Sequence, residues 1–485
     1  MIFQSKSMGA DGDSISQETS FQYLFEQGSV LKSTFTKQGF EDFDFESLID
    51  QGILKPSRDD YYKLHFVGVL EPSRSPHNQA ILVLPKYLQS NSLDRRELDS
   101  HLGLILSALK KYRNSRRQVE FDDTLIFPNN FGAESTNNLA LADFFIRDFL
   151  NHGIYRKSRT THTLNSNGRV DWKRTINKTI PVISGNSIVY TSTIHKKIEM
   201  TTDPLISVFH QYAVSTLIQA YGDVLGYSLH PNIAGTVDNS RLIEQQVSLK
   251  RSSKLWQKLG KELRQTYGQR NLTLIRNLMN FIEPSYQSTN SMLIMGTKNF
   301  ENLWEDVLLH YLDSEGVTSA INREFPVAKW WDLEHSTILN APKGKPITDT
   351  VARVADDKYI IADAKYYNLE YDEKLRKFHG NGPGFNDIQK QIFYERLLLS
   401  IKGDVECANM LIYPRYELEN RNVLAPFGTV HIPISGLPFV VNFFGSAHLL
   451  LTYYTRSVSA HVSDLESLYN VSRSASLAAE THSNS

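Results

Sequence analysis

The chain of 485 residues contains a single cysteine, Cys407. One cysteine excludes an internal disulfide framework and any zinc site built from several cysteines. A chain without disulfides fits a reducing compartment, so we expect the protein in the cytoplasm. The first 20 residues contain one lysine and lack an apolar core of the length found in signal peptides, which argues against secretion.

Long apolar runs are also missing. Residues 425–455 carry no formal charge, but prolines, Asn442 and several glycines interrupt them. A membrane-spanning helix needs about 20 mostly apolar residues in succession, so we expect no membrane association. The short apolar runs at 439–441 and 449–451 predict a buried strand followed by a core helix.

A motif for binding nucleotide phosphates is absent as well. No segment matches Gly-x-x-x-x-Gly-Lys-Ser/Thr, the loop that Walker-type motors use. The glycine-rich stretch 380–384 lacks the lysine and the hydroxyl residue that should follow, and it predicts an ordinary loop. This sequence therefore supplies no Walker-type motor.

The chain has almost no net charge, with 52 basic and 53 acidic residues, whereas nucleic-acid-binding proteins usually have a basic excess. The charge is segregated, however. Residues 1–50 hold three basic and nine acidic side chains, whereas 101–180 hold 13 and seven. Three basic stretches, at 110–117, 156–178 and 250–276, favour contact with a phosphate backbone. An acidic partner protein or a solvated surface would also fit them.

Composition divides the chain into four parts. Residues 1–20 are rich in serine and glutamine and 457–485 are rich in serine, alanine and asparagine, so a flexible start and a disordered tail are expected. A break near 282–295 predicts a domain boundary. It separates a mixed α+β N-terminal part, 21–290, for partner or DNA binding from an α/β domain, 291–456.

The segment 346–367 carries the most informative pattern. Two β-rich runs flank a polar turn at 356–358, which is typical of a hairpin. On the second run, Asp363 and Lys365 are two residues apart and therefore point to one face of the sheet. Asp349 lies near the start of the first run, where it can sit beside them.

Two carboxylates placed side by side next to an ammonium repel one another, which costs free energy unless the site binds a ligand that needs the charge. A divalent cation bound by Asp349 and Asp363 would offset their repulsion, and hard oxygen ligands suit Mg²⁺ or Mn²⁺. Lys365 would then orient or polarise the attacking water, and the cation would stabilise charge that develops on a phosphate. The alternative is an ordinary ion pair on an exposed sheet.

The Asp-x-Lys triplet alone has little specificity, because this chain contains four of them. Asp356 lies in the predicted turn and Asp372 lies in a charged run, so both predict solvent-exposed surface. Only Asp363 follows a strand as apolar as Tyr-Ile-Ile-Ala with a second acid upstream. Context therefore selects the triplet at Asp363.

Two helices are expected beside the hairpin. Residues 299–312 place apolar side chains on one stripe, bordered by Glu305 and by the glutamate four residues before it. Either glutamate can reach a metal site at the edge of the stripe, or both are ordinary boundary residues. Asp387 opens the second helix, on which Gln389 or Gln391 can hydrogen-bond a phosphate, a water or a base edge. A lone glutamine is more often a surface residue.

The order of these residues resembles the PD-(D/E)xK nuclease core. More closely, the chain is similar, over about residues 120–455, to the McrC and LlaJI-type restriction endonuclease subunits. The motifs that carry the resemblance are Leu303-Trp304-Glu305, Asp387-Ile388-Gln389-Lys390-Gln391 and Gly168-Arg169-Val170-Asp171-Trp172-Lys173-Arg174-Thr175-Ile176. The third motif explains the triplet at Asp171 as structural. Pro346 stands three residues before Asp349, which departs from the adjacent Pro-Asp pair of the family.

The resemblance implies a PD-(D/E)xK restriction-endonuclease-like domain, a mixed sheet flanked by helices, at 291–456. It implies a Mg²⁺-dependent endonuclease, or one that uses Mn²⁺, acting on double-stranded DNA. Asp349 and Asp363 are the implied metal ligands, assisted by Glu305. Lys365 is the residue that positions or activates water, and the Lys-Gln pair favours Gln391 over Gln389 as the auxiliary group.

The resemblance also implies a multi-component restriction system. The N-terminal region of this family docks onto a separately encoded McrB-like AAA+ GTPase that translocates DNA, and DNA methyltransferases belong to such systems. Two alternatives remain open: a nuclease-fold adaptor that does not cut, and a nuclease of repair, transposition or RNA processing. The intact Asp/Asp/Lys set argues against the first, and the motif at 168–176 argues against the second.

Overall fold

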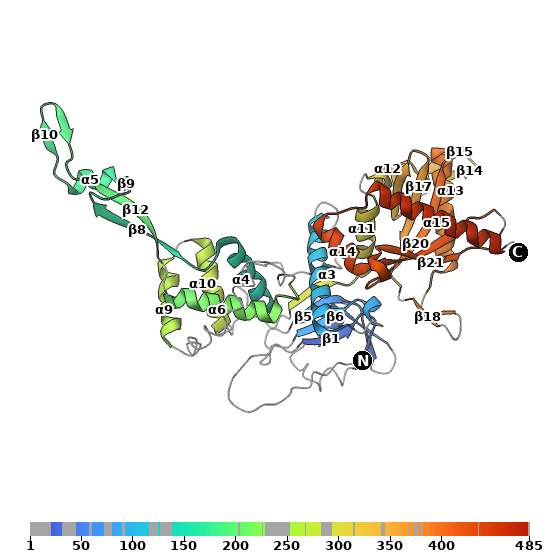
Figure 1. Cartoon of the computed structure of the whole chain (residues 1–485), viewed down its shortest axis with the longest axis horizontal. Helices are drawn as coiled ribbons and strands as arrows, with labels where there is room; N and C mark the ends of the chain where they lie inside the picture. The colour runs from blue at the N-terminus through green and yellow to red at the C-terminus, as the bar shows by residue number, and fades with distance from the viewer. Residues whose placement is uncertain are drawn as a thin grey trace. The chain divides into compact units, whose positions relative to one another are not determined.

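The chain divides into two compact units (Figure 1). Unit 1 comprises 1–128, 223–226 and 290–485, and unit 2 comprises 129–222 and 227–289. The predicted flexible segment 1–20 lies outside the described residues. The computed structural model describes residues 21–31, 45–57, 61–71, 80–89, 93–115, 125–126, 138–201, 204–225, 227, 253–266, 268–282, 293–313, 316–340, 345–367, 369–372, 377–379, 382–434 and 436–483.

The first sheet of unit 1 joins strands from distant parts of the sequence. Its strand order is β1-β6-β5-β13-β7, and the strands span Phe21–Phe25, Ala80–Leu84, Val67–Glu71, Leu293–Thr297 and Leu125–Ile126. β5 and β6 are buried along their whole length, which fits their continuous apolar sequences. Where β13 pairs with β5, a Cβ atom on Gly68 would lie 2.2 Å from the carbonyl oxygen of Met295, so only glycine fits there.

This sheet corrects the predicted domain division. A boundary does fall at 289–290, but residues 21–128 group with the C-terminal part, and the second unit consists of 129–222 and 227–289. The physical reason is β13, which follows the boundary and completes the N-terminal sheet by pairing with both β5 and β7. The other elements of this region are β2 (Ser29–Leu31), α2 (Phe45–Asp50), β3 (Leu54–Pro56), β4 (Tyr61–Leu64), η1 (Lys86–Leu88) and α3 (Arg95–Ser115).

The second sheet of unit 1 is mixed, in the order β16-β17-β20-β22-β21. Its strands are Thr350–Ala355, Lys358–Ala364, Glu406–Arg415, Val440–Ser446 and Leu424–Val430. β17, β20 and β22 run parallel, whereas the two edge strands are antiparallel to their neighbours. The fold of this region is therefore mixed α/β. The hairpin predicted within 346–367 is confirmed as β16 and β17, and the buried strand predicted at 439–441 is confirmed as β22.

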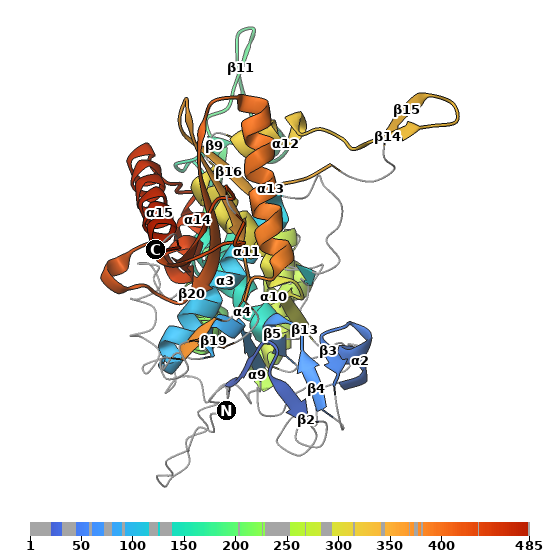
Figure 2. The same cartoon turned by 90° about the vertical axis from the view of Figure 1, so that its right-hand side faces the viewer.

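Helices cover this sheet on both faces (Figure 2). They are α11 (Phe300–Leu312), α12 (Val317–Glu324), α13 (Phe385–Lys402), α14 (Ala447–Arg456) and α15 (Val462–Ser483). Ile361 on β17 packs with α12 and α13 in one core cluster. The alternate side chains of the strand face α11, on which seven apolar side chains are buried as its sequence stripe predicts. Smaller elements are β14 (Lys329–Asp332), β15 (Thr337–Asn340), β18 (Glu370–Asp372), β19 (Lys377–His379) and η3 (Glu419–Arg421).

The predicted disordered tail at 457–485 is wrong for most of its length, because α15 occupies Val462–Ser483. Its low-complexity composition hides an apolar stripe. Leu465 and Tyr469 are buried, and the Tyr469 hydroxyl donates a hydrogen bond of 2.6 Å to Glu406 on β20. The tail is helical because it packs along the second sheet, which local composition does not reveal.

Unit 2 is a helical body with a projecting arm (Figure 1). The body consists of α4 (Asn138–His152), α6 (Pro204–Tyr221), α9 (Ser253–Gln265) and α10 (Gln269–Ile282). Arg270 on α10 forms a bidentate ion pair with Asp148 on α4, with both N–O distances 2.7 Å. The arm contains β8 (Lys157–Leu164), β9 (Arg169–Val170), α5 (Trp172–Lys178), β10 (Val182–Ser184), β11 (Ser187–Val189) and β12 (Ile194–Thr201).

The three basic stretches occupy different settings. In the first, Lys111 donates hydrogen bonds to the Tyr454 carbonyl and, at 2.9 Å, to the Ser457 hydroxyl, so it caps the C-terminal end of α14. Residues 116–117 of that stretch lie outside the described part of the chain. The second stretch lies on the arm. Most of the described part of the third, 253–266 and 268–276, lies on α9 and α10. Within the ranges that the structure describes, no helix is long and apolar enough to cross a bilayer.

Candidate active site

The hairpin brings the two predicted carboxylates together. In its register Thr350 pairs with Ala362, so Asp349 and Asp363 lie opposite one another where the β16–β17 ladder ends. The backbone N–H of Ala364 donates a hydrogen bond of 3.2 Å to Asp349 Oδ2. The structure therefore confirms the expected position of Asp349 beside Asp363.

Lys365 lies directly after β17 and faces the same side as Asp363. Its Nζ is 2.6 Å from Asp363 Oδ2 and 3.0 Å from Asp387 Oδ1. Its backbone N–H continues the sheet by donating to the Ile412 carbonyl at 2.9 Å. The ammonium is thus held between one carboxylate of the sheet and one carboxylate of a helix.

Asp387 is the site residue for which the sequence predicted no role. It lies in the first turn of α13, where its Oδ2 accepts a hydrogen bond of 3.0 Å from the Gly384 N–H and one of 3.3 Å from the Tyr367 hydroxyl. The sequence signal was an aspartate at the third position of a helix, which indicates a capping residue. Its second contact, with Lys365, depends on how α13 packs against β17.

The pKa values of Asp349, Asp363, Lys365 and Asp387 are all shifted from their usual values. Burial, together with the negative charge of Asp349, raises the pKa of Asp363 to about 7. Burial and the charge of Glu305 raise the pKa of Asp349. Burial opposes the charge on Lys365, but the Asp363 and Asp387 carboxylates outweigh it and raise the pKa of the ammonium.

The pKa of Asp387 moves in the opposite direction. Burial alone would raise it, but the hydrogen bond from Lys365 and the Gly384 N–H together lower it. Asp387 also lies near a helix N-terminus, where a negative charge is favoured. Its carboxylate is therefore ionised under conditions in which Asp363 begins to take up a proton.

The Leu-Trp-Glu motif lies on α11 against the same strand. Trp304 is buried, and its Nε1–H donates to the Ile412 carbonyl at 3.3 Å, the same oxygen that accepts from the Lys365 backbone. Glu305 is half-buried, and its charge acts on Asp349. The tryptophan therefore supports the strand at the site, while the glutamate adds negative charge beside the first carboxylate.

The two candidate glutamines have opposite environments. Gln389 is exposed, whereas Gln391 is fully buried and its Nε2 donates to the Met410 carbonyl on β20 at 3.1 Å. Gln391 Oε1 is also buried, and no hydrogen-bond partner for it occurs among the described residues. An auxiliary role for Gln391 stays a prediction. Oε1 is the atom that would fill it, because Nε2 is bonded to Met410.

The other Asp-x-Lys triplets have structural settings. Asp171 begins α5 and accepts a hydrogen bond of 3.1 Å from the Arg174 N–H, which confirms it as part of a structural motif. Asp356 lies in the exposed turn between β16 and β17, as predicted. Asp372 is the last residue of β18.

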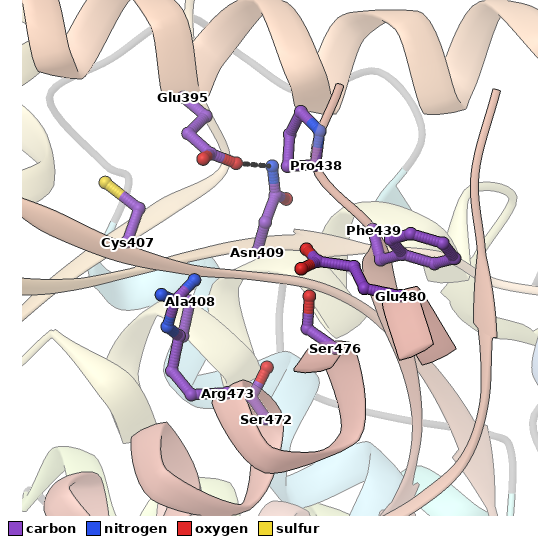
Figure 3. Close-up of a pocket in the computed structure, with 10 residues that line it drawn as sticks. All are labelled: Glu395, Cys407, Ala408, Asn409, Pro438, Phe439, Ser472, Arg473, Ser476 and Glu480. Carbon is purple, nitrogen blue, oxygen red and sulfur yellow. Dashed lines mark hydrogen bonds between the residues drawn. The ribbon is translucent and has the colours of Figure 1, made fainter. Parts of the chain in front are cut away.

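A small polar cavity lies where α13, β20 and α15 meet (Figure 3). It has a volume of about 30 Å³ and is lined by Glu395, Cys407 and Asn409 together with residues of α15. Asn409 Nδ2 donates to Glu395 Oε2 at 3.0 Å and to the Gln391 carbonyl at 2.9 Å. A cavity of this size holds little more than a water molecule, so we assign it to the packing of α13 on β20.

The carboxylate pair fits a divalent cation by its chemistry. Asp349 and Asp363 supply hard oxygen donors, and each has a raised pKa because burial and neighbouring negative charge oppose its ionisation. Among the residues that the structure describes, no three His, Cys, Asp or Glu side chains form a preformed metal cage. A cation held by two carboxylates would keep several waters, as Mg²⁺ does.

Comparisons with known proteins identify the family of this chain. A family model, the LlaJI restriction endonuclease, matches residues 66–448. The type II restriction enzyme BsuMI component YdjA of Bacillus subtilis (strain 168) is 24% identical over 428 residues, which cover 86% of this chain and 86% of that protein. A solved structure is similar with a TM-score of 0.35 and 14% identity, over 90% of this chain and 99% of that chain. It is the refined half-complex from the tetradecameric assembly of Thermococcus gammatolerans McrB AAA+ hexamers with bound McrC.

The family match covers most of the chain and identifies the class of protein, a subunit of a restriction system. The chain belongs to the LlaJI restriction endonuclease family. The site at the end of the β16–β17 hairpin lies within the matched residues.

Proposed function

We propose that this chain is the DNA-cleaving subunit of its restriction system, a metal-dependent endonuclease with a PD-(D/E)xK core. The observation that carries the proposal is the convergence of Asp349, Asp363 and Lys365 at one end of a mixed sheet, in a chain of a restriction endonuclease family. The substrate is double-stranded DNA, and the reaction is hydrolysis of a phosphodiester bond.

In this proposal Asp349 and Asp363 hold Mg²⁺ or Mn²⁺. Glu305 assists from α11, because its charge acts on Asp349. When bound, the cation would stabilise the negative charge that develops on the scissile phosphate. The raised pKa values support this role, since two buried carboxylates without a cation tend to share a proton.

Lys365 positions the nucleophile. Its ammonium lies 2.6 Å from Asp363 Oδ2, so a water hydrogen-bonded to Nζ lies beside the proposed ligands. A fixed donor of this kind holds the water in line with the phosphorus atom and lowers the entropic part of the barrier. Gln391 is the candidate auxiliary group through its buried Oε1.

The proposed partner is a separately encoded McrB-like AAA+ GTPase, in a system that also includes DNA methyltransferases. The sequence supports a division of labour because it contains no Walker-type loop. The arm of unit 2 supports a docking role because its tip exposes apolar side chains, with Ile180 87% and Ile183 75% exposed. Residues 156–201 of the arm also hold nine basic and two acidic residues, which suits an acidic partner.

Cleavage of plasmid DNA by the full chain, with its co-encoded partner and nucleotide, tests the proposal. We expect Asp363→Asn and Lys365→Ala to lower the rate by about a hundredfold or more, because each removes a group from the reacting centre. Asp356→Asn is the matched control from the exposed turn of the same hairpin, and it should cut normally. Unchanged cleavage by Asp363→Asn would contradict the proposal, and a wild-type chain that binds its partner but never cuts would favour a non-cleaving adaptor.

Partner docking has its own test. Ile183→Ser at the tip of the arm should weaken association with the AAA+ partner in a pull-down by about tenfold or more, since exposed apolar side chains dominate many interface contacts. Leu477→Ser changes an exposed apolar residue of α15 in the other unit and serves as the control. If Ile183→Ser binds the partner as tightly as Leu477→Ser does, the tip of the arm is not part of the interface.

A further inference from the structure

The lysine of the site has two anionic partners that differ in kind. Asp363 belongs to the carboxylate pair at the end of the hairpin, whereas Asp387 belongs to α13. The proposed function gives a role to the first contact only. The second contact, 3.0 Å from Lys365 Nζ to Asp387 Oδ1, has no part in holding a cation between Asp349 and Asp363.

The two oxygens of Asp387 have separate tasks. Oδ2 accepts from the Gly384 N–H at 3.0 Å and from the Tyr367 hydroxyl at 3.3 Å. These contacts fix the plane of the carboxylate and leave Oδ1 directed at the ammonium of Lys365. Tyr367 lies two residues after Lys365, so the segment that carries the ammonium also carries the hydroxyl that orients the Asp387 carboxylate.

A cation on the carboxylate pair changes the competition for Lys365. A divalent charge near Asp363 weakens the attraction between that carboxylate and the ammonium, because the cation and the lysine repel one another. Asp387 lies on a different element and retains its charge, since the pKa of its carboxyl group is lowered by Lys365 and by the Gly384 N–H. Long lysine side chains are flexible and need such a partner to keep one geometry.

We propose that Asp387 is a positioning residue, which holds the Lys365 ammonium at the reacting centre when a divalent cation engages Asp363. Tyr367 assists by fixing the orientation of the Asp387 carboxylate. This inference rests on the proposed function, because it assigns Lys365 a role in cleavage. It adds a residue that acts through Lys365 and touches neither the cation nor the DNA.

A capping role alone would not require this arrangement. Asp464 makes the equivalent cap at the start of α15, where its Oδ2 accepts from the His461 N–H at 3.0 Å. The two aspartates occupy the same helical position, three residues after the capping residue. The helix dipole therefore favours a negative charge on both carboxylates in the same way. Asp464 therefore provides a matched control for the capping contribution.

Chemical labelling of Lys365 reads the contact directly. The full chain is treated with an amine-acetylating reagent in the presence of Mg²⁺, and modification is measured by peptide mass spectrometry. Asp387→Asn should raise the labelling rate of Lys365 by about fivefold or more, because a side chain without this anionic partner is more often accessible to the reagent as the neutral amine that reacts. Lys402, which pairs with Glu324 at 2.9 Å on the other end of α13, is the internal control and should not change.

Cleavage by the complete system gives the second readout. Asp387→Asn should lower kcat by about tenfold to a hundredfold while KM for DNA changes little, because misplacement of a reacting group affects the chemical step. Asp387→Glu should recover part of the rate by restoring the charge. Tyr367→Phe should lower the rate by only a few fold, and Asp464→Asn should leave it unchanged.

Calorimetric titration with Mg²⁺ separates the two levels of inference. If wild-type protein binds Mg²⁺ and Asp387→Asn binds it equally, lower kcat with higher Lys365 labelling supports the positioning role. If labelling and kcat in Asp387→Asn match those of Asp464→Asn, the positioning role is wrong and the cleavage site stands. If wild-type protein binds neither Mg²⁺ nor Mn²⁺, the proposed function itself fails.

Discussion

The hydroxyl of Tyr366 donates a hydrogen bond to the carboxylate of Glu26, 340 residues away in the sequence. Tyr366 is the neighbour of Lys365 and points to the opposite face of the strand. The Lys86 ammonium lies 4.0 Å from the centre of the Tyr366 ring, and the Phe300 ring centre lies 5.0 Å from it. The N-terminal sheet therefore holds the segment that carries the catalytic candidate.

This contact predicts a pH effect on stability. Burial raises the pKa of Glu26 to about 7, above its usual value of 4.5. The contribution of a carboxyl group with a raised pKa is fully present below the unfolded pKa and is lost as the pH rises through the folded pKa. At pH 8 the buried charge destabilises the fold, so Glu26→Gln should raise the free energy of unfolding by roughly 1–3 kcal/mol there.

Denaturation of Glu26→Gln at several pH values checks this prediction. The gain should shrink toward pH 5, where wild-type Glu26 is itself protonated. Glu406→Gln is the control, because the hydrogen bond from Tyr469 lowers the pKa of the exposed Glu406 carboxyl group. That variant should gain no stability at pH 8, and a gain as large as that of Glu26→Gln would refute the role of burial.

Binding of the cation should depend on pH through Asp363. Burial and Asp349 raise its pKa to about 7, so the cation must displace a proton at lower pH. The increase in melting temperature on adding Mg²⁺ should therefore be larger at pH 8 than at pH 6, because a ligand that binds only the folded state stabilises it according to its affinity. An equal or larger increase at pH 6 would mean that Asp363 is not a ligand.

The single cysteine should be inert in the folded protein. Cys407 is buried, and burial raises the pKa of its thiol to about 12. Thiol reagents attack the thiolate, so native protein at pH 8 should react at least about a hundredfold more slowly than protein unfolded in urea. Rapid labelling of native protein would indicate that β20 and α15 separate readily at the cavity.

The buried glutamine separates a structural role from a catalytic one. Gln391→Met keeps the volume of the side chain but removes Oε1 and the bond to Met410. If Oε1 serves the site as we propose, cleavage should fall by about tenfold, whereas the loss of stability should be only about 1 kcal/mol. Gln389→Ala on the exposed face is the control. If Gln391→Met cleaves DNA at the wild-type rate, Gln391 has no auxiliary role in cleavage, and its role is limited to the structural contact with β20.

Local patterns predicted much of the candidate site. Alternation and a polar turn indicate the β16–β17 hairpin, and its register brings Asp349, Asp363 and Lys365 together. An apolar stripe of helical period indicates α11 and the buried Trp304. These features follow from side-chain periodicity within a few residues, which a sequence displays directly.

Contacts between distant segments were not predictable in this way. The pairing of β13 with β5, the packing of α15 on the sheet and the contact of Asp387 with Lys365 each depend on how separate elements meet. The spacing of residues within one segment does not reveal such long-range contacts. A Ser/Ala-rich helix such as α15 has the composition of a disordered tail, and it is stable because its few apolar residues pack against the sheet. The first basic stretch likewise suggested a phosphate contact, although Lys111 caps α14.

Titration of the full chain with Mg²⁺ tests most directly whether the hairpin carboxylates hold the catalytic cation. We predict one site per chain in the wild-type protein. Affinity should fall by about a hundredfold or more in Asp349→Asn and Asp363→Asn, because each loses a charged ligand, and it should be retained in Asp356→Asn. Unchanged binding of Mg²⁺ by the first two variants would contradict the proposed active site.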